Sequence, residues 1–433
     1  MVDFVFLYHP HIYETVPSAQ IGLGILSVAT YARDLGASVR VINAQAETVE
    51  RAIKLIPPCD YLCFYGCLVD TDIINAIAKA AKLRRLCNHV IVGGPIGKSP
   101  RYLQAPAVDI VHDGPGEPFI WRLLHGWISA CSSNYAPSFY GSIPKLCSEW
   151  ALEDIEKYPF PDRTLVKGPL GGRIFVRSDE EEEEQSTTIL MSRGCRHRCA
   201  FCSSANGSQP QSYSLERIEA ELDHCISLGL RNIRVSDDNI MDDPQRLKSI
   251  CRLLRDRSIK WRGSLRVTNH DVELYRLMAR SGCEELSFGV ESGDQEVLNA
   301  LRKGTKVCHN TEAVQNAKKA GIKVVRALMM MATPGESRKT LKQNKAWVRQ
   351  ARPDIVSLKV FVPYPGTDIF DSPAKYSCKL LHRSDHNNSS YRPDDSLPAA
   401  NIYLPGKMTA EELTQQFLEM RSWLEHYGIE NRG

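Results

Sequence analysis

The sequence alternates strand-like and helix-like segments in two separate series, and this pattern limits the fold to the α/β class. In residues 1 to 125, β-branched and aromatic runs such as FVFLY (4–8), VRVINAQ (39–45) and HVIVGGP (89–95) alternate with amphipathic stretches. Strands joined through helices form parallel sheets, because a parallel crossover needs a connection about as long as a helix. We therefore predict a Rossmann-like, doubly wound domain over residues 1–125.

A second strand–helix series covers residues 186–370. Its six strand-like runs include TTILMS (187–192), NIRVSDD (232–238) and IVSLKVFVPYPGT (355–367). Six strands with intervening helices are enough for a partial (β/α)6 barrel, whose active site is expected at the carboxyl ends of the strands.

Two segments flank this predicted barrel. Residues 126–185 are predicted to be a linker, which contains YPFPDR (158–163) and a run of six acids, Asp179 to Glu184. Like charges repel, so we expect the acidic run to be a solvated loop. Residues 371–433 are predicted to form a C-terminal extension, in which polar residues 376–401 contribute to a substrate pocket. Its last helix, Thr409 to Tyr427, is expected to pack through one apolar face, and a role as a lid over the barrel is the alternative.

Composition narrows the possible partners and the compartment. The formal net charge of +3 over 433 residues gives no indication of a nucleic-acid partner, and no apolar run approaches the ~18 residues of a membrane span. The 14 cysteines, without an export signal, predict a reducing cytoplasm. A small-molecule substrate is the expected partner.

Three cysteines are crowded into MSRGCRHRCAFCSS (191–204): Cys195, Cys199 and Cys202, spaced Cys-x3-Cys-x2-Cys. A structural zinc site needs four ligands, and His197 is too close in sequence to complete one. A disulfide framework would pair an even number of cysteines in a short secreted chain. A cubane [4Fe-4S] cluster fits better, because three thiolates leave one iron open for a substrate or cofactor.

The repeat Cys59, Cys63 and Cys67 is a second candidate metal site. It lies in a run that reads as a buried strand, and strand alternation would not gather the thiols as a helix would. We predict packed core thiols here rather than an auxiliary cluster.

The cysteine loop, with Phe201 before its last cysteine, resembles the radical S-adenosylmethionine (SAM) superfamily. GVESGD (289–294), ATPGES (332–337) and PYPGT (363–367) resemble strand-end motifs of the same superfamily. The resemblance implies that the open iron binds SAM, and that an electron from the cluster cleaves SAM to a 5′-deoxyadenosyl radical. An external electron donor such as flavodoxin or ferredoxin is then expected.

The N-terminal half resembles the cobalamin-binding domain that is often fused to such barrels. The residues that carry this resemblance are the helix after Pro17, GGP (93–95) and DGPGEP (113–118). Over about the first 370 residues, the chain looks like B12-binding-domain-type radical SAM enzymes, which include many methyltransferases and some cyclases.

Three polar residues at predicted strand ends are candidates for cofactor binding. Glu291 is expected to contact SAM, with capping of the next helix as the alternative. Arg266 is a candidate for the SAM carboxylate, and a buried ion pair is its alternative. Asp237, next to Asp238, could bind a ribose or substrate hydroxyl, or could be an ordinary turn acid.

Gly66, Gly93, Gly94 and Gly116 are the candidate contacts of cobalamin, since glycine lets a large ligand approach the backbone. The sequence lacks the Asp-x-His-x-x-Gly run that supplies an axial histidine in many B12 proteins. His9, His11 and His112 lie outside such a pattern, so we expect no protein histidine on cobalt. The alternative is a Rossmann-like domain that only scaffolds the barrel.

The resemblance implies a cobalamin-dependent C-methyltransferase that acts on a small molecule. It would use one SAM to methylate cob(I)alamin and another to generate the radical. A cobalamin-independent dehydratase, deoxygenase or epimerase acting on a polyol or aminosugar is the alternative. A non-catalytic iron–sulfur carrier is a third reading, against which the open iron argues.

Overall fold

The structure is a computed structural model that describes residues 2–9, 22–45, 47–104, 106–126, 145–146, 154–166, 186–204, 210–267, 271–381 and 400–431. The chain forms two compact units. Unit 1 contains Met1–Arg173, Glu183–Thr187 and Glu216–Leu230, and unit 2 contains Ile174–Glu182, Thr188–Leu215 and Arg231–Gly433.

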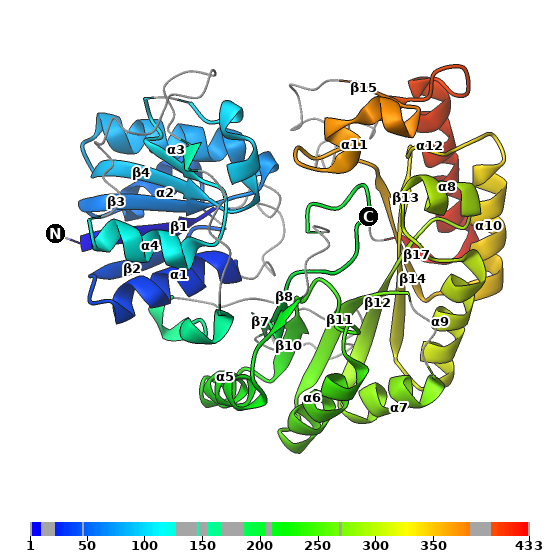
Figure 1. The fold of residues 1–433 in the computed structure, drawn as a ribbon, viewed down its shortest axis with the longest axis horizontal. Coiled ribbons are helices and arrows are strands. Elements are labelled where there is room, and N and C mark those ends of the chain that lie inside the picture. The colour runs from blue at the N-terminus through cyan, green and yellow to red at the C-terminus, as the bar shows by residue number, and fades with distance from the viewer. Residues whose placement is uncertain are drawn as a thin grey trace. The chain divides into compact units, whose positions relative to one another are not determined.

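Unit 1 is built on a six-stranded parallel sheet with the order β2-β1-β3-β4-β5-β6 (Figure 1). Its strands are β1 (Val2–Tyr8), β2 (Val39–Asn43), β3 (Cys59–Tyr65), β4 (Cys87–Gly93), β5 (Ile110–His112) and β6 (Lys145–Leu146). The strand order reverses direction between β1 and β3, as it does in doubly wound sheets. The predicted doubly wound domain is confirmed.

Helices cover both faces of this sheet. Ile53 of α2 (Val49–Leu55) and Ile77 of α3 (Thr71–Leu83) belong to one buried cluster, together with Leu62. Leu26 of α1 (Leu23–Asp34) and Phe119 of α4 (Gly116–Leu124) belong to the other cluster. Neighbouring residues of each strand point to opposite faces, so one strand contributes to both cores.

Residues 154–166 pack with the N-terminal sheet. They contain two short 3-10 helices, η5 (Ile155–Lys157) and η6 (Arg163–Leu165). Val166 forms an isolated parallel bridge with Val41 of β2 and joins the buried cluster of Leu26. This part of the predicted linker 126–185 therefore belongs to the N-terminal core.

The main sheet of the second series has the order β17-β14-β13-β12-β11-β10-β7. Its strands are β7 (Ser186–Ile189), β10 (Asn232–Val235), β11 (Lys260–Arg266), β12 (Cys283–Glu291), β13 (Val324–Met331), β14 (Ile355–Val360) and β17 (Glu430–Asn431). The six predicted strands are all present, and β17 adds a seventh from the predicted C-terminal extension. The partial barrel is confirmed.

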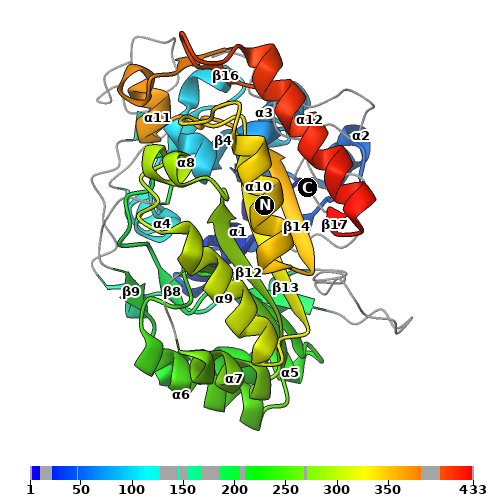
Figure 2. The same cartoon turned by 90° about the vertical axis from the view of Figure 1, so that its right-hand side faces the viewer.

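Four helices cover the outer face of this curved sheet: α6 (Pro244–Asp256), α7 (Val272–Arg280), α9 (Val307–Lys319) and α10 (Thr340–Ala351) (Figures 1 and 2). The shorter α8 (Gln295–Ala300) and α11 (Asp368–Asp371) follow β12 and β14. Helix α5 (Leu215–Ser227) connects to β10, but Glu216–Leu230 cluster with unit 1.

The last helix, α12 (Ala410–Tyr427), starts at a capping box formed by Thr409 and Glu412 and ends at Gly428 in the left-handed conformation. It packs beside α10 and against β13 and β14 (Figure 2). It therefore thickens the outer layer and is not a lid. Tyr427, which we predicted on the packing face, is 40% exposed.

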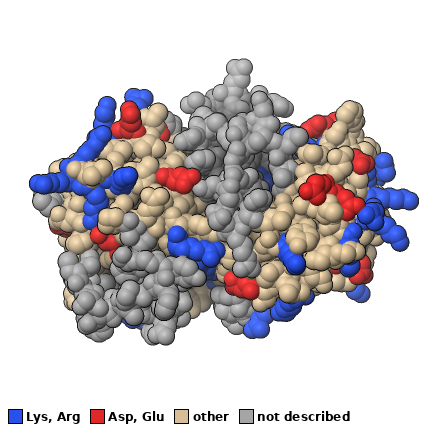
Figure 3. Space-filling view, turned by 90° about the horizontal axis from the view of Figure 1, so that it is seen from above, with Lys and Arg blue, Asp and Glu red and all other residues tan. Residues whose placement is uncertain are grey.

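Charge and hydropathy of the described residues agree with the composition. Basic and acidic side chains appear over both units (Figure 3). Within the described ranges, no helix is long and apolar enough to cross a membrane. The acidic run Asp179–Glu184, Pro17, His11 and most of residues 376–401 lie outside the described residues.

Candidate functional site

The cysteine loop begins where β7 ends and is closed at its base by a small antiparallel ribbon. The ribbon pairs β8 (Ser192–Arg193) with β9 (Gln211–Ser212). Cys195, Cys199 and Cys202 are partly exposed thiols in the loop between these strands. Burial raises the pKa of the Cys195 thiol above its ordinary value.

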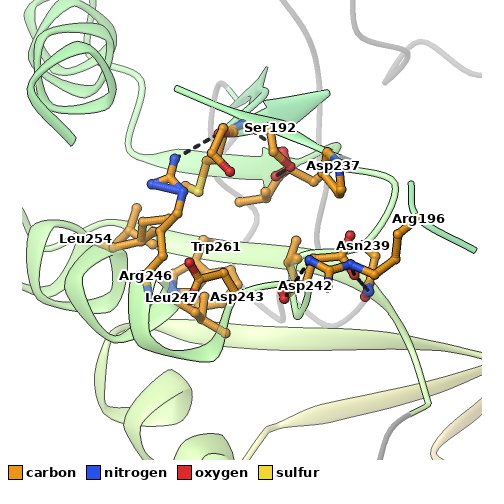
Figure 4. Close-up of a pocket in the computed structure, with 16 residues that line it drawn as sticks. Ser192, Arg196, Asp237, Asn239, Asp242, Asp243, Arg246, Leu247, Leu254 and Trp261 are labelled. Atoms are coloured by element: carbon orange, nitrogen blue, oxygen red, sulfur yellow. Dashed lines mark hydrogen bonds and ion pairs between the residues drawn. The ribbon is translucent and has the colours of Figure 1, made fainter. Parts of the chain in front are cut away.

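Asp237, at the end of β10, holds the root of this loop. The Met191 N–H donates to its Oδ1 (2.7 Å) and the Ser192 hydroxyl to its Oδ2 (2.6 Å), as Figure 4 shows for Ser192. Burial raises the pKa of Asp237 to about 6, although these hydrogen bonds lower it. Because both carboxylate oxygens are engaged, we assign Asp237 to holding the loop rather than to a ribose or substrate hydroxyl.

Further polar contacts fix the same region around a cavity of about 160 Å³ (Figure 4). Arg246 of α6 donates from Nη2 to the carbonyls of Met191 (2.9 Å) and Tyr213 (2.6 Å). Arg196, inside the loop, lies 3.7 Å from Asp242. These contacts tie both ends of the cysteine loop to the start of α6.

The segment between the second and third cysteines is anchored through its backbone. The Ala200 N–H donates to the Leu301 carbonyl (2.9 Å), and the Ala200 carbonyl accepts from the Ile369 N–H (3.1 Å). The Cys202 N–H donates to the Cys199 carbonyl (3.2 Å) and so forms a turn. The two thiols therefore project from a backbone that Leu301, just after α8, and Ile369, in α11, hold in place.

The donor set fits a cluster better than a single ion. A tetrahedral zinc site would bring the sulfurs within about 3.8 Å of one another. In the described part of the chain, no group of three His, Cys, Asp or Glu side chains is close enough to hold one metal ion. In a cubane cluster each thiolate binds a different iron, so three spaced thiols suit it.

Glu291, the last residue of β12, forms a buried ion pair that the sequence did not predict. Its Oε1 lies 2.6 Å from Lys303 Nζ, and both side chains are less than a tenth exposed. Glu291 has a φ of +62°, a strained value for a residue with a side chain. It does not cap the following helix, because Asp294 is the N-cap of α8.

Gly289 makes room for this pair. A Cβ at Gly289 would lie 2.8 Å from Lys303 Nζ and 2.9 Å from Glu291 Oε1. Lys303 also lies over the ring of Phe201 in the cysteine loop, 5.7 Å from its centroid. The end of β12 is thus linked through Lys303 to the cysteine loop.

Arg266, at the end of β11, also reaches the cysteine loop. Its Nη1 donates to Cys199 Sγ (3.2 Å), and its backbone N–H donates to Asn239 Oδ1 (3.1 Å). Among the described residues, the Arg266 side chain contacts this thiol and not a carboxylate, the predicted alternative.

A cavity of about 420 Å³ opens beside these groups. Its described lining contains basic and imidazole side chains and no carboxylate: His197, Arg198, Arg266, Val267, Arg302, Lys303, Gly304, Thr305 and His309. A cavity of this composition is suited to an anionic group.

Side-chain hydrogen bonds fix both of the motifs GVESGD and ATPGES. The Thr340 hydroxyl donates to Asp294 Oδ2 (2.6 Å), and the Thr333 N–H donates to Glu336 Oε1 (2.8 Å). Burial raises the pKa of Glu336 to about 7. A Cβ at Gly335 would lie 2.6 Å from Ala300 Cβ. Asp294 therefore ties the start of α8 to the start of α10, and Glu336 closes the loop after β13.

The candidate cofactor edge of the N-terminal sheet lies at the carboxyl ends of β1, β3 and β4. A Cβ at Gly93 would meet no atom of the described residues within 4 Å, so its backbone has space for a ligand beside it. A Cβ would instead lie 2.5 Å from Ile74 at Gly66, 2.9 Å from Tyr65 at Gly94 and 2.4 Å from Val28 at Gly116. These three glycines allow neighbouring side chains to pack closely against the backbone. Of the four glycines predicted to contact cobalamin, Gly93 alone has the space that a ligand would need.

Histidines near this edge are already engaged. His9 Nε2 lies 2.8 Å from the Glu47 carbonyl, and His112 Nε2 lies 2.8 Å from the Pro115 carbonyl. His112 also stacks on Phe119.

The three cysteines of the second candidate metal site are not gathered in one place. Cys59 and Cys63 belong to clusters on opposite faces of the sheet, and Cys67 is exposed. Burial raises the pKa of Cys59 to about 12.

Known proteins share both the sequence pattern and the fold. Residues 189–348 match the Radical SAM superfamily. The chain is 23% identical over 368 residues to a Pyrococcus horikoshii protein named uncharacterized methyltransferase PH0819, covering 81% of this chain and 77% of that one. It is 26% identical over 381 residues to the hopanoid C-3 methylase of Methylococcus capsulatus, covering 84% and 71%.

Two solved structures have the same fold. The radical SAM methyltransferase TsrM from Kitasatospora setae, with cobalamin and a [4Fe-4S] cluster bound, has a TM-score of 0.66 at 16% identity and covers 89% of this chain and 81% of that one. OxsB, a cobalamin-dependent SAM radical enzyme solved with aqua-cobalamin and SAM, has a TM-score of 0.71 at 17% identity and covers 98% and 67%.

Residues 189–348, which contain the cysteine loop and most of the barrel, are thus similar to the radical SAM superfamily. Across both units, the chain shares its fold with TsrM and OxsB, whose structures contain bound cobalamin.

Proposed function

We propose that the chain is a cobalamin-dependent radical SAM methyltransferase that acts on a small molecule. The observation that supports the proposal most strongly is that charged side chains from two strand ends lie beside the cysteine loop. Arg266 contacts Cys199, and Lys303 joins Glu291 to Phe201, at the edge of a cavity whose described lining has no carboxylate. Cys195, Cys199 and Cys202 would hold a [4Fe-4S] cluster there.

The chain's own residues have separate roles in this proposal. Arg266 and Lys303 provide positive charge for the SAM carboxylate, and Glu291 provides a carboxylate for the SAM ammonium. Asp237 and Arg246 fix the root of the loop. Glu291 has a strained backbone, and so does Ala332 at the end of neighbouring β13, where φ is +59°. Such strain is typical of functional sites, which supports a functional role for this edge of the sheet.

Cobalamin would lie at the carboxyl edge of the N-terminal sheet, with Gly93 as the open backbone position. Both named relatives are methylating enzymes by name, and both solved structures contain bound cobalamin. When bound, the cluster supplies the electron that cleaves SAM to a 5′-deoxyadenosyl radical, and cobalamin supplies a methyl group. An external reductant such as flavodoxin or ferredoxin would deliver the electron.

One observation favours the second candidate, a cobalamin-independent dehydratase, deoxygenase or epimerase. Three of the four predicted cofactor glycines are packed against side chains of the same domain. In this alternative the N-terminal domain only supports the barrel.

The products formed from SAM distinguish the two candidates. The anaerobically reconstituted protein, loaded with hydroxocobalamin and a reductant, is incubated with SAM. The proposal predicts both 5′-deoxyadenosine and S-adenosylhomocysteine. Formation of 5′-deoxyadenosine without S-adenosylhomocysteine would favour the second candidate, and formation of neither would contradict both.

A further inference from the structure

The sequence YPFPDR carries two adjacent charged residues that point to different parts of unit 1. Asp162 is directed to α1: its N–H donates to the Thr30 hydroxyl (2.9 Å), and its carboxylate accepts from Arg33 Nη1. The Tyr158 ring meets Tyr31 edge-on at 5.1 Å. This end of the segment is therefore fastened to a helix of the N-terminal domain.

Arg163 is directed to the elements that flank the cysteine loop. Its guanidinium is 1% exposed, and Nε donates to the Thr187 hydroxyl of β7 (2.9 Å). Nη2 donates to Glu221 Oε1 of α5 (2.7 Å), and Nη1 donates to the Pro161 carbonyl (2.9 Å). The planar guanidinium thus spans the strand that enters the loop and the helix that follows it.

The contacts on α5 are deeply buried. Glu221 is 2% exposed, and Arg217 approaches its other oxygen at 3.5 Å. The Arg163 N–H donates to His224 Nε2 (3.3 Å), and Phe160 packs near the His224 ring at 5.4 Å. A buried charge needs a fixed partner, so α5 cannot shift away from Arg163 without leaving Glu221 poorly paired.

We propose that Arg163 is a positioning residue, which ties β7 and α5 to the N-terminal domain and so fixes the strand that leads into the cysteine loop. Thr187 lies eight residues before Cys195, and α5 begins three residues after the closing ribbon. The role at the cluster rests on the proposed function, whereas the clamp on β7 and α5 does not.

The clamp is tested by hydrogen exchange on the cofactor-free full chain. Arg163→Met is compared with Arg326→Met, a matched control, because Arg326 is also buried and lies 2.8 Å from a buried carboxylate, Glu285. We expect peptides covering β7 and α5 to exchange at least about tenfold faster in Arg163→Met, but not in Arg326→Met. Unchanged exchange in these peptides would overturn the proposal.

The role at the cysteine loop is tested by electron paramagnetic resonance of the reduced, reconstituted cluster. We expect an altered cluster signal in Arg163→Met, partial recovery in Arg163→Lys, and the wild-type signal in Arg326→Met. An unaltered signal in Arg163→Met would overturn the positioning role. A wild type that holds no cluster would contradict the proposed function, and hydrogen exchange would still decide the clamp.

Discussion

Lys303 Nζ lies 2.6 Å from Glu291 Oε1 and 5.7 Å from the centroid of Phe201, so one ammonium joins a strained strand end to the cysteine loop. We expect Glu291→Gln to weaken SAM binding roughly ten- to a hundredfold, since a charge-assisted hydrogen bond contributes ~1.5–3 kcal/mol. Equilibrium dialysis with the reconstituted protein measures this affinity.

The matched control is Glu285→Gln. Glu285 is a buried carboxylate near the other end of β12, paired with Arg326. The Glu285→Gln substitution should lower the free energy of unfolding. Its SAM affinity should stay within about twofold of the wild-type value, because the affected pair lies away from the cysteine loop. Equal losses of SAM affinity in both variants would show that Glu291 acts only through the fold.

The cluster cysteines have a direct test. The triple variant Cys195→Ala, Cys199→Ala and Cys202→Ala should bind no cluster iron after reconstitution and should release no 5′-deoxyadenosine, because the open iron needs all three thiolates. Cys67→Ala, a change at an exposed thiol after β3, should keep full iron content. Iron retention with SAM cleavage in the triple variant would refute the assignment.

Two glycines of the N-terminal domain should respond differently to valine. Gly93→Val has room for its Cβ in the free protein and should reduce cobalamin retention with little change in melting temperature. Gly116→Val would place a Cβ 2.4 Å from Val28 Cγ2 and should destabilise the domain. Melting curves and corrin content after desalting separate the effects. Normal corrin retention in Gly93→Val would exclude Gly93 from the site.

Asp237 gives a pH-dependent prediction. Burial raises its pKa in the folded state to about 6, above the ordinary value of 3.8, so the folded protein binds an extra proton between these values. Stability from this group is present below about pH 4 and is lost as pH rises to about 6. Relative to Asp237→Asn, which cannot ionise, the wild type should lose up to about 3 kcal/mol over this range.

Denaturant unfolding of the cluster-free proteins at pH 4 to 7 measures this difference. A constant gap between wild type and Asp237→Asn across the range would mean that the pKa of Asp237 is not raised.

The strands of both sheets that are longer than three residues were predictable, because their apolar, β-branched runs stand out from the amphipathic helices between them. Strands β6 and β17 have two residues each, which is too short for any periodicity. The C-terminal helix was predicted from its apolar face, but its place beside α10 depends on tertiary packing that no local pattern encodes.

The site was predictable where chemistry depends on local spacing, as for the three cysteines. Lys303 was missed because it lies twelve residues after Glu291, beyond α8, and only folding returns it to the strand end. The glycines show the converse difficulty. Gly93 and Gly116 read alike in sequence, although one is open and the other packs against Val28.

Retention of cobalamin tests the central claim most directly. Wild-type protein is loaded with excess hydroxocobalamin under anaerobic conditions, desalted and reduced to the Co(II) form. The account predicts stoichiometric corrin and a spectrum without superhyperfine splitting from a protein histidine nitrogen, because His9 and His112 are engaged by backbone carbonyls. Protein that retains no corrin yet still converts SAM to 5′-deoxyadenosine would contradict it.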